Sequence, residues 1–221
     1  MTDKRNPYHE RHARDRDRHR CPDRLPPAPG AEQHPALDLA NSALVLPGGH
    51  TLDLLASPAD ATQWLAARDL APADAGLQEV CAGRLRTLRD QVTALLTSRI
   101  DSAPPPFAAL DAVNDALTGA PAAAVLLWDE THGLHRAPSH PADRIVDHAL
   151  AVLAADAADL LTGPDAERLA ACGSAPCHRL LLRTHGRRQW CSVRCGDRAR
   201  AARAYARRAR PAPARTPDEA A

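Results

Sequence analysis

The sequence predicts an α+β fold, in which a mainly helical N-terminal domain with a few short strands precedes a small C-terminal module and a basic helix. Three observations predict it. Apolar residues recur at helical spacing in two long stretches, 74–99 and 142–161. Between them, a turn flanked by two short apolar runs at 125–137 predicts a β-hairpin. Near the C-terminus, two close pairs of cysteines are followed by an arginine-rich stretch.

Composition divides the chain into four segments. Residues 1–30 mix charges of both signs with His and Pro and contain few apolar residues, so we expect a disordered tail. We assign the large domain to 31–168, the C-terminal module to 169–210 and a second disordered tail to 211–221. The 221 residues are 44% hydrophobic but only 3% aromatic, so the core is expected to consist of Leu, Ala and Val.

The first elements of the large domain are short. Residues 36–41 (ALDLAN) are predicted to be a strand, and residues 52–55 to be another strand or an extended segment. Ser57 is a favourable N-cap residue and Pro58 a favourable first residue of a helix, so we expect a helix that continues to Arg68.

The longest helix is predicted at 74–99. Seven side chains at helical spacing form its apolar face. Because Cys81 belongs to this face, we expect it to be a buried core thiol rather than a ligand or a nucleophile. The seven residues are Leu77, Val80, Cys81, Leu85, Leu88, Val92 and Leu95.

The rest of the large domain alternates helices with one hairpin. After a proline-rich break, we expect a helix at 107–117 and then a hairpin with strands at 125–128 and 134–137. A second long helix is predicted at 142–161. A short helix at 165–171 is expected to lead into the C-terminal module.

The four cysteines of the C-terminal module form two close pairs, Cys172 with Cys177 and Cys191 with Cys195. Zn²⁺ prefers four ligands in a tetrahedron, and a short loop lets both thiolates of a pair reach the metal. The loops contain four and three residues, and the thirteen residues between the pairs bring them together. We therefore predict a structural Zn²⁺ site with these four cysteines as ligands.

Other uses of the cysteines are less consistent with the sequence. Disulfides suit a secreted protein, but the chain shows no signal peptide. A redox site normally has a Cys-x-x-Cys motif near a βαβ unit, which this sequence does not show. An iron–sulfur cluster also accepts four thiolates, but a cluster with these spacings is less common than a zinc site. His178 and His185 could each replace a thiolate, but with four cysteines already paired we expect both histidines to lie outside the ligand set.

A basic helix is predicted from Gly196 to Arg210, where Pro211 ends it. Four arginines of this helix are spaced so that they share one face. The residues on the opposite face, mostly alanines, are expected to pack on the hairpin that the metal holds. Between 172 and 210 there are eleven arginines and one acid, which is typical of a surface that binds phosphate, although a merely solvated basic face is the alternative. The arginine face contains Arg200, Arg203, Arg207 and Arg210, and the packed side contains Ala199, Ala202, Tyr205 and Ala206.

The C-terminal module resembles the CGNR-type zinc finger. The resemblance is carried by Arg187-Arg188-Gln189-Trp190-Cys191-Ser192 and by Cys195-Gly196-Asp197-Arg198. The four cysteines and Arg198 match the family pattern. Asp197 stands where the family has asparagine, and Arg183 where an aspartate is common. Aspartate is favourable in the first turn of a helix, so Asp197 is a candidate cap for the basic helix.

The preceding domain resembles the ABATE domain, which usually precedes this finger. The matching residues are Leu37-Asp38-Leu39-Ala40-Asn41-Ser42, Trp64-Leu65 and Leu88-Arg89, and the two resemblances together cover about 36–205. They imply a bacterial transcription regulator whose larger domain binds a ligand or a partner.

Charge supports a division of labour between the two parts. Residues 31–171 contain nineteen acids and eight arginines, whereas the C-terminal module is strongly basic, so only the module is expected to touch DNA. The opposite charges also suggest that the two parts dock and mask the basic face until a ligand releases it. We expect Trp190 to pack beside the metal site, and the predicted phosphate contacts are Arg187, Arg188, Arg198, Arg200, Arg203 and Arg207.

The predicted function is therefore that of a zinc-dependent, DNA-binding transcription regulator. The alternatives are a finger that binds protein or RNA without a transcriptional role. A ligand of the large domain and a homodimer are further candidates. No stretch approaches the roughly 18 apolar residues of a membrane helix, so we expect a cytoplasmic protein. We expect no enzymatic activity, because the chain has no phosphate-binding glycine loop and four thiolates leave no open position on a metal.

Overall fold

The structure, a computed structural model, describes residues 26–45, 50–120, 124–138 and 144–209. Most of the predicted N-terminal tail and the whole tail at 211–221 lie outside these residues. Within these residues the elements are mainly helices, together with three separate two-stranded antiparallel sheets, so the predicted α+β class is confirmed. No helix in the described part is long and apolar enough to cross a membrane.

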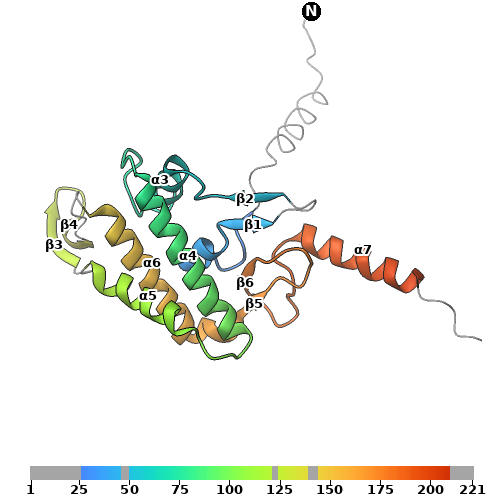
Figure 1. Cartoon of the computed structure of the whole chain (residues 1–221). Coiled ribbons are helices and arrows are strands. Elements are labelled where there is room, and N and C mark those ends of the chain that lie inside the picture. Colours follow the sequence, from blue (N-terminus) through green and yellow to red (C-terminus); the bar gives the residue numbers. More distant parts are fainter. Residues whose placement is uncertain (1–25, 46–49, 121–123, 139–143, 210–221) are drawn as a thin grey trace, which may run out of the picture.

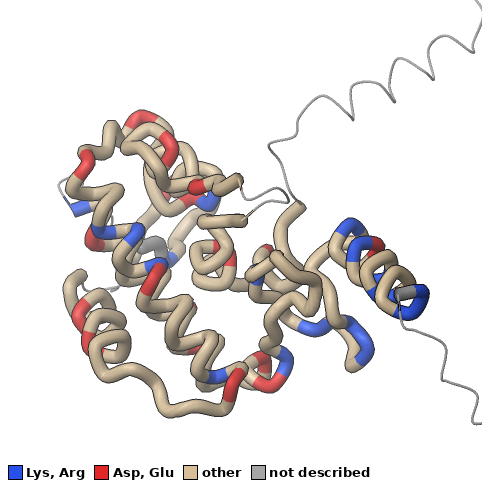
Figure 2. Tube along the Cα trace, turned by 45° about the vertical axis from the view of Figure 1, so that its right-hand side comes forward, with Lys and Arg blue, Asp and Glu red and all other residues tan. Residues whose placement is uncertain are grey.

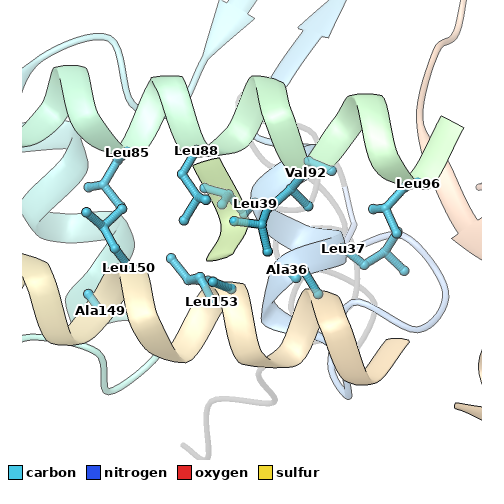
Figure 3. Packing of buried hydrophobic residues seen from close by; sticks show 14 of the residues in the cluster. Ala36, Leu37, Leu39, Leu85, Leu88, Val92, Leu96, Ala149, Leu150 and Leu153 are labelled. Atoms are coloured by element: carbon cyan, nitrogen blue, oxygen red, sulfur yellow. The ribbon is translucent and has the colours of Figure 1, made fainter. Parts of the chain in front are cut away.

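Three long helices form the body of the large domain: α4 (Glu79–Ile100), α5 (Phe107–Gly119) and α6 (Ile145–Thr162) (Figure 1). All three were expected, α4 and α6 from helical spacing, although these two begin later than predicted. Figure 3 shows Leu85, Leu88 and Val92 of α4 directed toward side chains of α6, with Leu37 and Leu39 alongside them. Leucine, alanine and valine therefore make up most of this main core, as the composition predicts.

The predicted apolar face of α4 is only partly buried. Leu85, Leu88, Val92 and Leu95 are buried, but Val80 is exposed because the first turn extends beyond the core. Cys81 is half-buried and packs against the main core, and its thiol is free.

The strand predicted at 36–41 is wrong, because these residues form helix α2 (Pro35–Ala40). Pro35 occupies the first turn, where its missing N–H costs nothing. Four of the six residues are buried, since α2 packs against both α4 and α6. Over so few residues an alternating pattern and a helical pattern are indistinguishable, and tertiary packing decides between them.

The next segment forms a small sheet and a capped helix. Strands β1 (Ala43–Val45) and β2 (Thr51–Asp53) pair antiparallel, so the strand predicted at 52–55 overlaps β2 only in part. Helix α3 (Pro58–Ala66) confirms the helix expected after Ser57. The Ser57 hydroxyl accepts a hydrogen bond from the Asp60 backbone N–H (3.2 Å), and the Asp60 carboxylate accepts one from the Ser57 N–H (3.1 Å).

The predicted hairpin is present as strands β3 (Ala124–Asp129) and β4 (Gly133–Pro138), with Trp128 opposite Leu134. Gly133 at the turn has a φ of +63°, a conformation that favours glycine. The apolar side chains of Leu126, Trp128 and Leu134 are about two-thirds exposed, at 68%, 68% and 72%.

The helix predicted at 165–171 is wrong in its second half. A single 3₁₀ turn, η1 (Pro164–Arg168), is followed by strand β5 (Leu169–Ala171), which pairs with β6 (Leu180–Leu182). The strand forms because its two faces have different partners: Leu169, Leu180 and Leu182 join the main core, whereas Ala170 and Leu181 join a second cluster. We call this second cluster, which contains Ala170, Cys172, Leu181, Cys191 and Cys195, the module core.

Residues 26–30, the end of the predicted N-terminal tail, lie against β6. The backbone N–H of Leu182 donates to the carbonyl of Pro29 (2.8 Å), and Ala28 is fully buried. The described fold therefore begins before the predicted boundary.

Helix α7 (Val193–Ala209) projects from the body at the end opposite the β3–β4 hairpin (Figure 1). It begins before the predicted start at Gly196. Ala199 is buried, but Ala202, Tyr205 and Ala206 are exposed, so the predicted packing of that side is wrong. Most of the helix extends past the β5–β6 sheet and its loops (Figure 1). The predicted docking of the basic face on the acidic domain is also absent, since the ion pairs of the described residues join no α7 arginine to the large domain.

Candidate metal centre

The four cysteines meet in one cluster, which we call the metal centre. Cys172 follows β5, Cys177 lies in the β5–β6 loop, Cys191 precedes α7 and Cys195 lies in its first turn. All four Sγ atoms lie within 4.8 Å of one another, with 3.7 Å between Cys177 and Cys191 and 3.6 Å between Cys191 and Cys195. A tetrahedral zinc site with Zn–S bonds of about 2.3 Å needs sulfur atoms about 3.8 Å apart. The four thiols therefore have the chemistry and the spacing that Zn²⁺ requires.

Backbone hydrogen bonds bring the two pairs together. The N–H of Cys172 donates to the carbonyl of Arg179 (2.9 Å), which extends the β5–β6 ladder by one step. The N–H of Gly173 donates to the carbonyl of Gln189 (2.9 Å), and this bond holds the loop that carries the second pair. Both pairs are thus fixed relative to one sheet.

The start of α7 fixes Cys195. The hydroxyl of Ser192, the residue before the helix, accepts a hydrogen bond from the Cys195 N–H (3.3 Å). Ser192 therefore acts as the cap. The prediction that Asp197 caps the helix is wrong, because Asp197 lies inside α7 and pairs with Arg200 (2.6 Å).

The thiols are held in a setting that disfavours ionisation without a metal ion. The hydrogen bond from Cys177 and burial raise the pKa of Cys191 to about 12. Burial also raises the pKa of Cys172. A divalent cation supplies the positive charge that favours four thiolates at neutral pH, so metal binding is expected to release protons here.

Two arginines lie at the metal centre. The guanidinium of Arg198 donates to the Sγ of Cys195 (3.0 Å) and to the Ser174 hydroxyl (3.2 Å), so it faces inward although it was predicted to meet phosphate. Arg179 is buried in the module. Sequence reasoning missed Arg179, because its position opposite Cys172 depends on the pairing of β5 with β6.

The other predicted phosphate contacts lie at the surface. Arg187, Arg200, Arg203 and Arg207 are exposed, and Arg188 is half-buried, with its Nε donating to the Trp190 carbonyl (3.3 Å). We call these five arginines the basic surface. Figure 2 shows Lys and Arg gathered on α7 and the adjoining module, whereas most Asp and Glu lie on the large domain.

Trp190 connects the metal centre to the basic surface. Its ring packs against the module core, which confirms the predicted location. The guanidinium groups of Arg200 and Arg203 lie over the ring, 5.7 Å and 5.5 Å from its centroid, at cation–π distance. A Cβ atom on Gly196 would lie 3.3 Å from the ring, so the glycine allows the tryptophan to lie close to α7.

The two candidate histidine ligands lie outside the cluster. His178 and His185 are both exposed, and the group of possible metal ligands at this place contains only the four cysteines. Within the described residues, the site is therefore an all-sulfur site.

The comparisons with known proteins match the two parts of the chain separately. A family model named ABATE, described as "Putative stress-induced transcription regulator", matches residues 33–164. A model described as "CGNR zinc finger" matches residues 168–208. Both are regulator or zinc-finger families rather than enzyme families. No curated protein matches the chain.

Proposed function

Because the chain belongs to the ABATE family and carries a CGNR zinc finger, we propose that it is a transcription regulator that binds duplex DNA through the basic surface. Zn²⁺ bound by Cys172, Cys177, Cys191 and Cys195 would hold the β5–β6 sheet, the following loop and the start of α7 in one arrangement. The metal would thus have a structural role, since four protein ligands leave no position for water.

The observation that carries the proposal is the exposed row of arginines on a helix that projects from the body (Figure 1). Arg200, Arg203 and Arg207 are spaced so that they share one face of α7. An α-helix fits the major groove of B-DNA, and arginines along it can reach phosphates on either side. The acidic large domain lies away from this helix, which limits electrostatic repulsion (Figure 2).

DNA titration over a salt series tests the proposal. The zinc-loaded full-length protein should bind duplex DNA with a log–log salt slope of several phosphate contacts, at about 0.9 per phosphate. Replacing Arg200, Arg203 and Arg207 by Gln should reduce the slope by about three such contacts. The matched control is Arg136→Gln, an exposed arginine on the hairpin at the opposite end.

The outcomes separate the alternative functions. Zinc without nucleic-acid binding would favour a finger that binds protein. Stronger binding to structured RNA than to duplex DNA would favour an RNA-binding role. Equal slopes for the wild type and the triple variant would contradict the assignment of the basic surface.

A groove between α4, α5 and α6 supports a ligand-binding role for the large domain. Its volume is about 560 Å³, within the range of small-molecule sites. Leu88, Ala116 and Leu150 contribute apolar surface, and the ion pair of Arg84 with Asp147 (2.6 Å) lies at its edge. We propose a small amphipathic ligand for this groove.

The hairpin is the candidate surface for a homodimer. β3 and β4 pair only with each other in the described residues, and their apolar side chains are exposed. Unpaired strand edges with apolar side chains readily pair with another copy. A dimer formed there would leave both α7 helices at its outer ends.

A further inference from the structure

Arg179 is a buried charge without a complete set of partners. The residue is 7% exposed, and its Nη2 donates to the Pro26 carbonyl (2.9 Å). Its Nε and Nη1 have no hydrogen-bond partner among the described residues, where no carboxylate forms an ion pair with it either. A buried guanidinium in such a position is costly unless a negative charge lies nearby.

The β5–β6 ladder places this charge beside the cysteines. Arg179 lies opposite Cys172, one step beyond the pair of Ala171 with Leu180. Side chains alternate between the faces of a strand, so Arg179 shares the face of Leu181, which belongs to the module core. Cys172, opposite Arg179, and Cys191 belong to the same module core, so Arg179 lies on the face of the sheet that is directed toward the cysteines.

Arg198 approaches the same cluster from α7. Its Nη2 lies 3.0 Å from the Sγ of Cys195, and its Nε donates to Ser174, which is buried. A charged donor stabilises a thiolate more than a neutral thiol. The Arg198 guanidinium therefore interacts with the sulfur of Cys195 and is not available at the outer surface.

The charges of the site and of the two arginines balance. Four thiolates and one divalent cation carry a net charge of about −2, and two guanidinium groups offset it. We propose that Arg179 and Arg198 are the counter-charges of a metal–tetrathiolate centre and determine how tightly the protein retains Zn²⁺. This inference rests on the zinc site of the proposed function, and it removes Arg198 from the predicted DNA contacts.

Zinc release from the full-length, zinc-loaded protein tests the inference. Arg179→Met removes the charge and keeps much of the side-chain volume. Because residues that contact metal ligands typically contribute 10–100-fold to metal affinity, transfer of zinc to a chromogenic chelator should be about 10–100-fold faster. Arg179→Lys keeps the charge and should restore most of the retention. The matched control is Arg208→Met, an exposed arginine of α7 outside the basic surface, which should release zinc as the wild type does.

Thermal unfolding with and without the metal separates a charge role from a packing role. In the zinc-loaded form Arg179→Met should unfold at a lower temperature. After metal removal the same change should be neutral or stabilising, because an unpaired buried charge has been removed. If Arg179→Met does not fold, Arg198→Met at a half-buried position should give the same faster zinc release. Cobalt(II) absorption would show that the four thiolates are still the ligands.

Two results would overturn the inference while leaving the zinc site intact. One is zinc release from Arg179→Met and Arg198→Met at the rate of Arg208→Met. The other is an equal loss of stability in the zinc-loaded and metal-free forms, which would indicate packing alone. Absence of zinc from the wild-type protein is distinguishable from both, and would overturn the metal centre together with this inference.

Discussion

Asn41 is joined to Leu180 by two buried hydrogen bonds. Its Nδ2 donates to the Leu180 carbonyl (2.9 Å), and its Oδ1 accepts from the Leu180 N–H (2.8 Å). Asn41 directly follows α2, whereas Leu180 begins β6, so one amide side chain ties the large domain to the C-terminal module. Asn41 also belongs to the sequence motif that suggested the ABATE resemblance.

Asn41→Ala should therefore destabilise the protein by about 2–4 kcal/mol, because it leaves two buried backbone groups of Leu180 unpaired. Urea unfolding measures the change. Asn114→Ala, at an exposed position on α5, is the control and should change little. Equal stability of the Asn41 variant and the wild type would show that the side chain does not join the two parts.

Asp147 should contribute to the acid sensitivity of the large domain. The hydrogen bond from Arg84 lowers its pKa most, and Arg144 lowers it further. At pH values above the ordinary carboxyl pKa of about 4, a carboxylate whose pKa is lower in the folded state stabilises the protein. This contribution is lost as the pH falls below that value toward the lower folded-state pKa.

Asp147→Asn should then flatten the dependence of the unfolding free energy on pH between about 4 and 2. At neutral pH it should cost less than about 1 kcal/mol, because both arginines are about half exposed. Urea unfolding at a series of pH values gives the measurement. Asp111→Asn, an exposed acid on α5, serves as the control. An unchanged profile for Asp147→Asn would contradict the assignment.

Gly83→Leu should fill the groove of the large domain. A Cβ atom at Gly83 would meet only the Arg86 side chain, at 3.8 Å, so the first atom of a side chain fits here without a clash, and Gly83 lines the groove into which a leucine would extend. The protein should become more stable by about 0.5–1 kcal/mol, since glycine is a poor helix former. Binding of the dye 8-anilinonaphthalene-1-sulfonate should fall, whereas Gly186→Leu in the C-terminal module should leave it unchanged. Undiminished dye binding to Gly83→Leu would show that the groove is not an apolar ligand site.

Trp128→Arg should weaken a dimer formed through the hairpin, because it places two like charges at the shared edge. Light scattering over a range of protein concentrations measures the mass. Phe107→Arg changes another exposed apolar residue, on α5, and should not alter the mass. A wild-type protein that is monomeric throughout would rule out the hairpin dimer.

Local signals in the sequence predict part of this fold well. Ser57 and Pro58 carry their own capping chemistry, so α3 is recognisable from a few residues. The long helices repeat their apolar spacing often enough to be identified. α2 and β5 are too short for any periodicity, and tertiary contacts decide their structure. α2 packs against α6, more than a hundred residues later in the chain, whereas β5 pairs with β6 and packs against α4.

In the candidate site, too, local sequence predicts some features, whereas others depend on tertiary contacts. Cysteine spacing predicts the cluster, because the loop within each pair limits how far its thiols can separate. Charge alone does not indicate where an arginine points. Arg198 was therefore predicted at the DNA surface although it faces Cys195, and Arg179 was missed although it is buried in the C-terminal module.

The β5–β6 sheet has a practical consequence for dividing this protein. Leu169, Leu180 and Leu182 complete the main core from outside the residues matched by the ABATE family, since all three lie beyond position 164. A chain shortened to end at 168 would therefore lack these three leucines and expose the part of the main core that they cover. A separate finger would expose three leucines to water. We therefore expect a stable fragment to include both family matches. Deleting either part should destabilise the part that remains.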